Sequence, residues 1–221
     1  MNKLDKKLGI AAVLGVGMLV AGVASATTVT MDFEGLAGTP AEYVDNFYSG
    51  GCGTLVVGGK LGKPTCGGPD YGVVWSNALA GPKPNGHEPS PPNIMTYRGS
   101  SATMNVAAGF TDLLEFWFSA PNASGGIAIY SGLDGTGSLL ANANLGSTPV
   151  NCGGTGPIIG RGDCWEAFIL DFSGIAQSVV FATKTGTIGF DDVTITLYTP
   201  AANVPEPAAL GSFGLGALLV G

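Results

Sequence analysis

The sequence predicts an all-β domain, an antiparallel sandwich or barrel, between two apolar chain ends. Apolar and polar residues alternate with a period of two in several short segments, which is typical of strands with one buried face. Glycine accounts for 37 of the 221 residues, so strands should be short and turns frequent. No segment between the ends has the periodicity of an amphipathic helix.

The predicted strands follow one another along the chain. Residues 29–34 alternate strictly between polar and apolar side chains. Residues 113–118 are nearly all apolar, which favours a central strand covered on both faces, with Trp117 in the core. Residues 132–137 form a turn between two strands. The other strand segments are 95–97, 104–106, 127–130, 167–172, 178–182 and 187–198.

The first 26 residues have the three parts of a secretory signal peptide. Three lysines come first, an apolar run follows over residues 8–23, and Ala24 and Ala26 supply the small residues of a cleavage site. The apolar run is shorter than the roughly 20 residues that a membrane-spanning helix needs. We therefore expect cleavage after Ala26 and a mature chain outside the inner membrane.

The other end of the chain carries a second targeting pattern. Val204, Pro205, Glu206 and Pro207 precede residues 208–221, which are all apolar or small. This arrangement resembles the PEP-CTERM sorting signal read by the exosortase system of Gram-negative bacteria. The resemblance implies an exported envelope, surface or extracellular protein with an exosortase-type sorting enzyme as partner, which meets the membrane only through its signal and sorting segments. The family's terminal arginine cluster does not follow, so a truncated segment is expected.

Composition restricts the functions of the part between these ends. Without the leader, the chain keeps fifteen acidic and six basic residues. An acidic chain with no basic run is poorly suited to binding nucleic acid, so no nucleic-acid partner is expected. An acidic, sparsely charged surface is common in extracellular proteins and suits divalent cations.

The four cysteines form two local pairs, each around a loop rich in glycine and proline. In an exported protein an even number of cysteines indicates disulfides, and four cysteines allow three pairings. We favour the local pairing, Cys52 with Cys66 and Cys152 with Cys164. Each bond would stabilise the fold by roughly 3 kcal/mol in the chain-entropy model. Zinc is the alternative, but its ligands usually come in closely spaced pairs that these positions do not form.

Several stretches of the mature chain together resemble a recurrent group of PEP-CTERM surface proteins. They are residues 33–36, 46–48, 69–73, 77–80, 102–106 and 188–193. The resemblance implies a jelly-roll-like antiparallel β-sandwich similar to carbohydrate-binding modules. The expected organisation is a signal peptide over 1–26, a β-sandwich over 27–198, a linker over 199–203 and a sorting segment over 204–221.

No catalytic constellation stands out in the sequence. The one histidine, His87, lies beside Glu88 in a proline-rich loop, without the structured neighbour that orients the histidine of a triad. Glu115, Glu166 and Asp171 lie in or beside predicted strands, but nothing places two of them across a cleft, as glycoside cleavage requires.

Aromatic side chains offer a different function, a flat platform on which a sugar ring stacks. The candidates are Trp75, Trp117, Trp165, Tyr48, Tyr71 and Tyr130. We expect a non-catalytic surface or matrix protein that binds or contributes to exopolysaccharide. Two alternatives stay open: a secreted carbohydrate-active enzyme on a jelly-roll scaffold, and a purely structural matrix protein.

A structural calcium ion is expected where the first and last strands meet. Asp32 and Glu34 share one face of the first strand. In the last strand the apolar residues change from even-numbered to odd-numbered positions at Asp191 and Asp192. This change predicts a β-bulge there. The first and last strands are adjacent in many jelly-roll modules, so the four carboxylates would converge as oxygen ligands for calcium. The alternative is that these acids simply face water.

Overall fold

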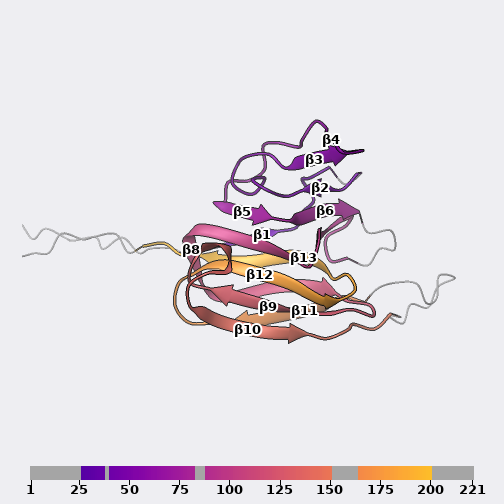
Figure 1. Cartoon of the computed structure of the whole chain (residues 1–221). Helices are drawn as coiled ribbons and strands as arrows, with labels where there is room; N and C mark the ends of the chain where they lie inside the picture. The colour runs from indigo at the N-terminus through magenta and orange to yellow at the C-terminus, as the bar shows by residue number, and fades with distance from the viewer. Residues whose placement is uncertain (1–25, 38–39, 83–87, 151–163, 201–221) are drawn as a thin grey trace, which may run out of the picture. The chain divides into compact units, whose positions relative to one another are not determined.

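A computed structural model describes residues 26–37, 40–82, 88–150 and 164–200. Figure 1 shows the strands arranged in layers, and all pairings between the named strands are antiparallel. The described part of the chain is an all-β, jelly-roll-like sandwich, as the sequence predicts. Among these residues, no helix is long and apolar enough to cross a bilayer.

Sheet one contains five strand segments. Burial alternates along all seven residues of β9 (Ser124–Tyr130), so one face of that strand packs inward while the other stays half-exposed. The short 3₁₀ turn η1 (Leu133–Gly135) follows this strand, in the turn predicted for residues 132–137. In order, the segments are β10 (Leu139–Leu145), β9 (Ser124–Tyr130), β12 (Ala176–Thr185), the first half of β8 (Ser101–Ser119) and β5 (Val73–Ser76).

Sheet two continues from the second half of β8, which lies between β11 (Glu166–Asp171) and β13 (Gly189–Leu197). β8 serves both sheets because it bends near Gly109, which has φ 88° and so needs glycine. The pairing of β8 with β12 shifts register at the same place, and such bulges let a strand pass between sheets. The remaining strands are β1 (Thr27–Met31), β7 (Asn93–Tyr97), β6 (Ala78–Pro82), β2 (Glu42–Tyr43), β3 (Thr54–Val57) and β4 (Lys60–Leu61).

Aromatic rings from both sheets form the core between them. Phe181 of β12 lies 5.1 Å from Phe190 of β13 and 5.9 Å from Phe116 of β8, measured between ring centroids. All three rings are fully buried. Trp75 of β5 packs on Phe181 at 5.5 Å and is also buried. Burying rings of this size dominates the stability of a small sandwich.

The prediction that Trp117 lies in the core is wrong. Along this part of β8 the buried residues are Leu114, Phe116 and Phe118, and Trp117 between them is half-buried. β8 is central in the sheet, since β11 and β13 pair on either side of it. Its alternation nevertheless leaves one face partly open, so a nearly continuous apolar run does not require cover on both faces.

The first predicted strand is shorter than expected. Burial alternates through Glu34 as predicted, but β1 ends at Met31. Phe33 has φ 63°, a left-handed conformation that is rare for a residue other than glycine and that interrupts the extended backbone here. The backbone N–H of Glu34 donates a hydrogen bond to Asp32 Oδ1 at 3.2 Å, which closes a turn. Asp32 and Glu34 therefore lie on a turn after the strand, not on one face of it.

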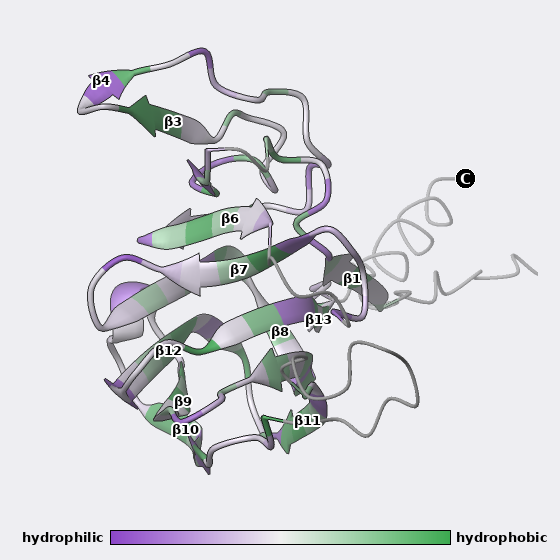
Figure 2. Cartoon of the chain, turned by 90° about the vertical axis from the view of Figure 1, so that its right-hand side faces the viewer, coloured by the Kyte–Doolittle hydropathy of each residue, from purple (hydrophilic) through white to green (hydrophobic). Residues whose placement is uncertain are grey.

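β3 and β4 form a hairpin between the first two cysteines, and Figure 2 shows it at the opposite end of the stack from β9 and β10. The Cys52–Cys66 disulfide is confirmed. Cys164 is disulfide-bonded. Cys152 lies outside the described residues, so the Cys152–Cys164 pairing stays a prediction.

Candidate functional site

The first and last strands meet at the junction of β1 and β13, as the sequence predicts. β1 pairs with β13, with Met31 opposite Val193. On its other side β13 pairs with β8, and there the register shifts between Asp191 and Thr194. Asp192 has φ 48°, which is uncommon outside glycine. The adjacency of the first and last strands and the β-bulge are both confirmed, and at the bulge Asp191 is fully buried.

The segment between β6 and β7 is fastened to this bulge. Ser90 N donates a hydrogen bond of 3.0 Å to Asp191 Oδ2. The Ser90 hydroxyl lies 3.0 Å from Asp191 Oδ1 and 2.8 Å from Asp192 Oδ1. At the start of β7, Asn93 N donates to Glu34 Oε1 at 2.7 Å. The same segment thus contacts acids from both ends of the chain and brings them together.

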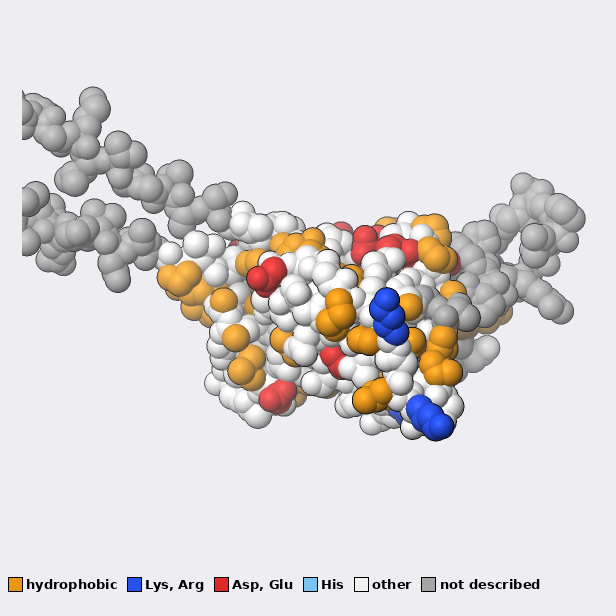
Figure 3. Space-filling view, turned by 90° about the horizontal axis from the view of Figure 1, so that it is seen from above, with side chains coloured by type: hydrophobic (Ala, Val, Ile, Leu, Met, Phe, Trp, Pro, Cys, Tyr) orange, Lys and Arg blue, Asp and Glu red, His pale blue; other side chains and the backbone are white. Residues whose placement is uncertain are grey.

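Five acids gather here and are named the acidic cluster: Asp32, Glu34, Glu88, Asp191 and Asp192. Burial raises the pKa of Glu34, and the charges of Asp32, Glu88 and Asp192 raise it further, against one backbone hydrogen bond that lowers it. Burial raises the pKa of Asp191 to about 7, and the charge of Asp192 contributes to the rise. Charged side chains are sparse on the face seen in Figure 3, where one group of carboxylates lies together and other acidic side chains stand singly.

Glu88 is the member of the cluster that the sequence did not identify, because its proline-rich loop has no periodicity. It is only 8% exposed, and its Oε2 is buried without a hydrogen-bond partner in the described structure. Burying such an oxygen costs free energy unless a cation or a water molecule contacts it. In the described ranges, no three His, Cys, Asp or Glu side chains already form a set that could hold a metal. A cation would therefore have to draw the carboxylates closer together.

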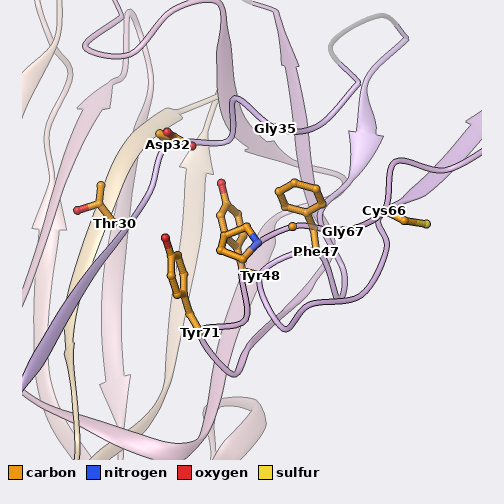
Figure 4. A pocket seen from close by; sticks show the side chains of 10 residues that line it. Thr30, Asp32, Gly35, Phe47, Tyr48, Cys66, Gly67 and Tyr71 are labelled. Carbon is orange, nitrogen blue, oxygen red and sulfur yellow. The ribbon is translucent and has the colours of Figure 1, made fainter.

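A polar pocket of about 370 Å³ lies beside the acidic cluster and shares Asp32 with it. It is named the tyrosine pocket. Thr30 and Asp32 line one side, and Tyr48, Tyr71 and the loop 66–69 line the other. Figure 4 shows the hydroxyl groups of both tyrosines pointing toward the side on which Asp32 lies. The pocket therefore combines ring faces with a carboxylate and a hydroxyl group.

The two tyrosines have different roles. Their rings are stacked, with centroids 6.1 Å apart and planes 11° apart. Tyr48 is buried, and its hydroxyl oxygen accepts a hydrogen bond of 2.6 Å from Phe33 N. Burial raises the pKa of Tyr48 well above its ordinary value. Tyr71 is half-exposed, so Tyr48 is a fixed wall and Tyr71 is the ring that a ligand can reach.

A second buried carboxylate that the sequence did not identify holds the loop of the pocket. Glu42 is fully buried in β2. Its Oε1 accepts a hydrogen bond from Thr65 N at 2.6 Å, and its Oε2 accepts from Thr65 Oγ1 at 2.8 Å and from Ala37 N at 3.0 Å. The Cys52–Cys66 disulfide lies next to Thr65 and fixes the same loop. Glu42 therefore supports the pocket without lining it.

The other aromatic candidates separate by burial. Trp75 is buried in the core and offers no face to a ligand. The half-exposed candidates are Tyr71, Tyr130, Trp117 and Trp165. Of these, Tyr71 lines the tyrosine pocket and Tyr130 lines a groove on sheet one.

The strand acids considered for glycoside cleavage do not face each other across a cleft. Glu166 and Asp171 lie on β11, five positions apart and so with opposite parity. Glu115 lies opposite Ile169, and Ile169 is 56% exposed, so Glu115 and Asp171 share the outer face of the sheet. These positions match solvent-facing strand acids. His87 lies outside the described residues.

The targeting patterns fall largely beyond the described structure. The apolar run, Ala24, and the motif Val204, Pro205, Glu206 and Pro207 lie outside the described residues. Ala26 is the first described residue and is exposed. The signal peptide, its cleavage and the sorting segment therefore stay predictions.

No family model matches the sequence, and no curated protein matches it. Solved structures resemble the fold. The K2 cleaved adhesin domain of Lys-gingipain is 9% identical with a TM-score of 0.46, over 77% of this chain and 100% of that one. A family 29 carbohydrate-binding module from Piromyces equi is 8% identical with a TM-score of 0.38, and the match covers 82% of this chain and 97% of that module. CsCBM6-3 from Clostridium stercorarium, solved with cellobiose, is 16% identical with a TM-score of 0.35, and the match covers 57% of this chain and 86% of that one. Likenesses of this size assign neither a function nor a ligand to this chain.

Proposed function

We propose that this chain is an exported surface or matrix protein that binds exopolysaccharide without cleaving it, and that the tyrosine pocket takes a sugar ring. The single observation that carries the proposal is the pairing of the half-exposed Tyr71 ring with the Asp32 carboxylate in one polar pocket. The resemblance of both chain ends to targeting signals supports export by a Gram-negative bacterium and sorting by an exosortase-type enzyme.

The chemistry of a pyranose fits these walls. One face of the ring presents C–H groups, which pack on an aromatic ring, and its rim carries hydroxyl groups. Tyr71 would take the apolar face, while the carboxylate of Asp32 and the hydroxyl of Thr30 would bond to the rim. A hydrogen bond to a charged acceptor is stronger than one to a neutral acceptor, so Asp32 would fix the orientation of the sugar.

We also propose a structural calcium ion at the acidic cluster. Its support is the orphaned Oε2 of Glu88 and the burial of Asp191 among other carboxylates. Calcium takes six to eight oxygen ligands in flexible geometry, which suits carboxylates from a turn, a loop and a bulge. The ion would offset the mutual repulsion of the cluster and hold the turn that carries Asp32.

The calcium proposal is tested by thermal unfolding of the full chain with calcium and with chelator. We expect calcium to raise the unfolding midpoint by several degrees, and Glu88→Gln and Asp191→Asn to reduce that rise. Asp112→Asn is the matched control, because Asp112 is exposed on β8 and should leave the rise unchanged. An equal midpoint with and without calcium would exclude the ion.

Sugar binding is tested by screening the full chain on an array of bacterial and plant polysaccharides. Affinity for the best neutral oligosaccharide should fall about tenfold in Tyr71→Ala, because the stacking face is lost. Tyr198→Ala, a half-exposed tyrosine beyond the end of β13, should bind as wild type. Release of reducing ends would instead support the carbohydrate-active enzyme. An array without a ligand would support the purely structural matrix protein.

Export and the second disulfide have a separate test. Protein purified from the cell envelope should begin at Thr27, and peptides mapped without reduction should contain the Cys152–Cys164 bond. Full-length protein in the cytosol, or a Cys152 that pairs elsewhere, would overturn these assignments.

A further inference from the structure

A groove crosses the outer face of sheet one, away from the acidic cluster. It is named the sheet groove and has a volume of about 340 Å³. Three adjacent strands, β10, β9 and β12, supply its lining. Apart from Tyr130, none of the residues discussed so far lines this surface.

The strand register explains why this face is hollow. Gly126 of β9 lies opposite Ala182 of β12, and Ala128 lies opposite Val180. On β9, the central strand of the three, the outward position thus has no side chain at Gly126 and a single methyl group at Ala128. An added Cβ at Gly126 would lie 3.0 Å from Ala143 O, so the floor admits no larger residue without a shift.

Polar groups stand along one side of this small floor. Asn142 and Asn144 are exposed on β10, opposite Ala128 and Gly126. Two residues apart on one strand, they point to the same face. Their amides offer both donors and acceptors to a ligand that lies across β9.

The two ends of the groove differ in chemistry. The half-exposed ring of Tyr130 lies at one end, opposite Ser178 of β12. Lys184 lies at the other end, six residues further along β12, which is about 20 Å of strand. The Lys184 ammonium donates a hydrogen bond of 3.0 Å to Asn144 Oδ1, a neutral amide oxygen. The groove therefore runs from an aromatic ring to a cation.

The position of Lys184 is unusual for this chain. The formal net charge is −7, and Lys184 is one of four basic side chains in the described ranges, with Lys60, Lys63 and Arg98. Arg98 lines a different hollow, and the other two are exposed on or beside the β3–β4 hairpin. An acidic glycan would be repelled by most of the surface, but here it would meet an accessible cation.

We propose that the sheet groove binds a saccharide chain that carries carboxylate groups, as uronic acids do. This inference rests on the proposed function only in taking a polysaccharide as the ligand, since the two sites share no residue. Tyr130 stacks on one sugar ring, and Asn142 bonds to hydroxyl groups. Lys184 pairs with a carboxylate, which releases the Asn144 amide oxygen to accept from the sugar. Specificity for an acidic chain comes from Lys184, since the other groups suit any sugar.

The probes are tetragalacturonate and cellotetraose, titrated into the full chain at one fixed free-calcium concentration. We expect tetragalacturonate to bind more tightly, and its affinity to fall between about 0.01 M and about 1 M salt, where the Debye length shortens from ~30 Å to ~3 Å. Lys184→Met should lower the affinity for tetragalacturonate roughly fivefold and remove the salt dependence. Lys184→Arg should retain both, and Lys60→Met, an exposed lysine on β4, should change neither.

The outcomes separate this proposal from the proposed function. Loss of tetragalacturonate binding in Tyr130→Ala, with cellotetraose binding lost only in Tyr71→Ala, supports both sites. If tetragalacturonate binding depends on Lys184 while Tyr71→Ala changes the affinity for neither probe, the result supports the groove alone. Equal affinity for the two probes, or a wild-type affinity for tetragalacturonate in Lys184→Met, overturns the groove.

Discussion

The tyrosine pocket and the sheet groove are built in opposite ways. The pocket is assembled mainly from a turn after β1 and two loops, and Glu42, the Cys52–Cys66 disulfide and a few backbone bonds hold these together. The groove is the outer face of three paired strands, and its shape follows from their register. The pocket should therefore depend on single contacts far from its lining, whereas the groove should persist as long as the sheet does.

Removing Glu42 should have the largest effect on this contrast. Glu42→Ala removes three hydrogen bonds and leaves Thr65 N and Thr65 Oγ1 without their acceptor, while Ala37 N keeps a bond to Thr65 Oγ1. We expect a loss of about 4 kcal/mol in the free energy of unfolding, with neutral-sugar binding lost and tetragalacturonate binding kept. Denaturant unfolding and the two titrations measure this.

A graded series controls that result. Glu42→Gln keeps one carbonyl acceptor and should lose about half as much stability. Glu166→Ala removes an exposed carboxylate and should change stability by less than about 0.5 kcal/mol. If Glu42→Ala weakened both sites equally, the two regions would not be independent.

Opening the disulfide should have the next largest effect. The Cys52–Cys66 bond closes a loop with a sequence separation of 14, and its removal in Cys52→Ser/Cys66→Ser should cost about 3 kcal/mol. The loop 66–69 lines the pocket, so affinity for the neutral sugar should fall. Unchanged affinity at temperatures where the chain stays folded would show that the disulfide does not shape the pocket.

A change in pH should alter the stability of the region around the tyrosine pocket through the acidic cluster. Without calcium, the pKa of Asp191 is raised to about 7 in the folded chain by burial and by the charge of Asp192, against about 3.9 in the unfolded chain. The folded state then binds more protons at Asp191 between these values, so the contribution of Asp191 to stability is full below the lower pKa and is lost as pH rises through about 7.

Thermal unfolding in chelator at about pH 5 and about pH 8 measures this fall. Asp191→Asn should reduce the difference between the two midpoints, and calcium should oppose the fall by pairing with the ionised carboxylates. A midpoint that rises with pH in chelator would contradict the assigned direction.

The smallest expected effect tests the sheet groove, which is built from paired strands. Asn105 Nδ2 donates to Asp134 Oδ1, and Asn105 Oδ1 accepts from Asp134 N, both at 2.8 Å, so Asn105 holds the η1 turn near Tyr130. Asn105→Ala should cost about 1 kcal/mol, since both bonds are exposed. Tetragalacturonate affinity should change by less than about twofold, because the register of β9 sets the ring position. A larger change would show that the turn, and not the sheet, positions Tyr130.

Sequence patterns predicted the features that depend on local parity. The parity switch at Asp191 located the β-bulge, and the local spacing of Cys52 and Cys66 identified their disulfide. Alternation also placed β1, β7, β8, β9, β11, β12 and β13, whereas the short strands β2 to β6 were not predicted. These signals work because side-chain direction in a strand repeats every two residues.

The parts that were missed depend on distant partners. Ser90 and Asp191 are 101 residues apart, so no local pattern links the loop of Glu88 to the bulge. Glu42 sits in a strand of two residues, too short for periodicity to be visible. The small floor of the sheet groove consists of ordinary alanine and glycine positions, and it becomes a groove only through the pairing of β9 with its neighbours.

The most direct test of the central claim is a crystal structure of the chain with the best neutral oligosaccharide from the array. The account predicts a pyranose packed on the Tyr71 ring, with hydroxyl groups bonded to Asp32 and Thr30, while Tyr48 keeps its bond to Phe33 N. A sugar bound elsewhere on the domain, with the tyrosine pocket empty, would contradict it.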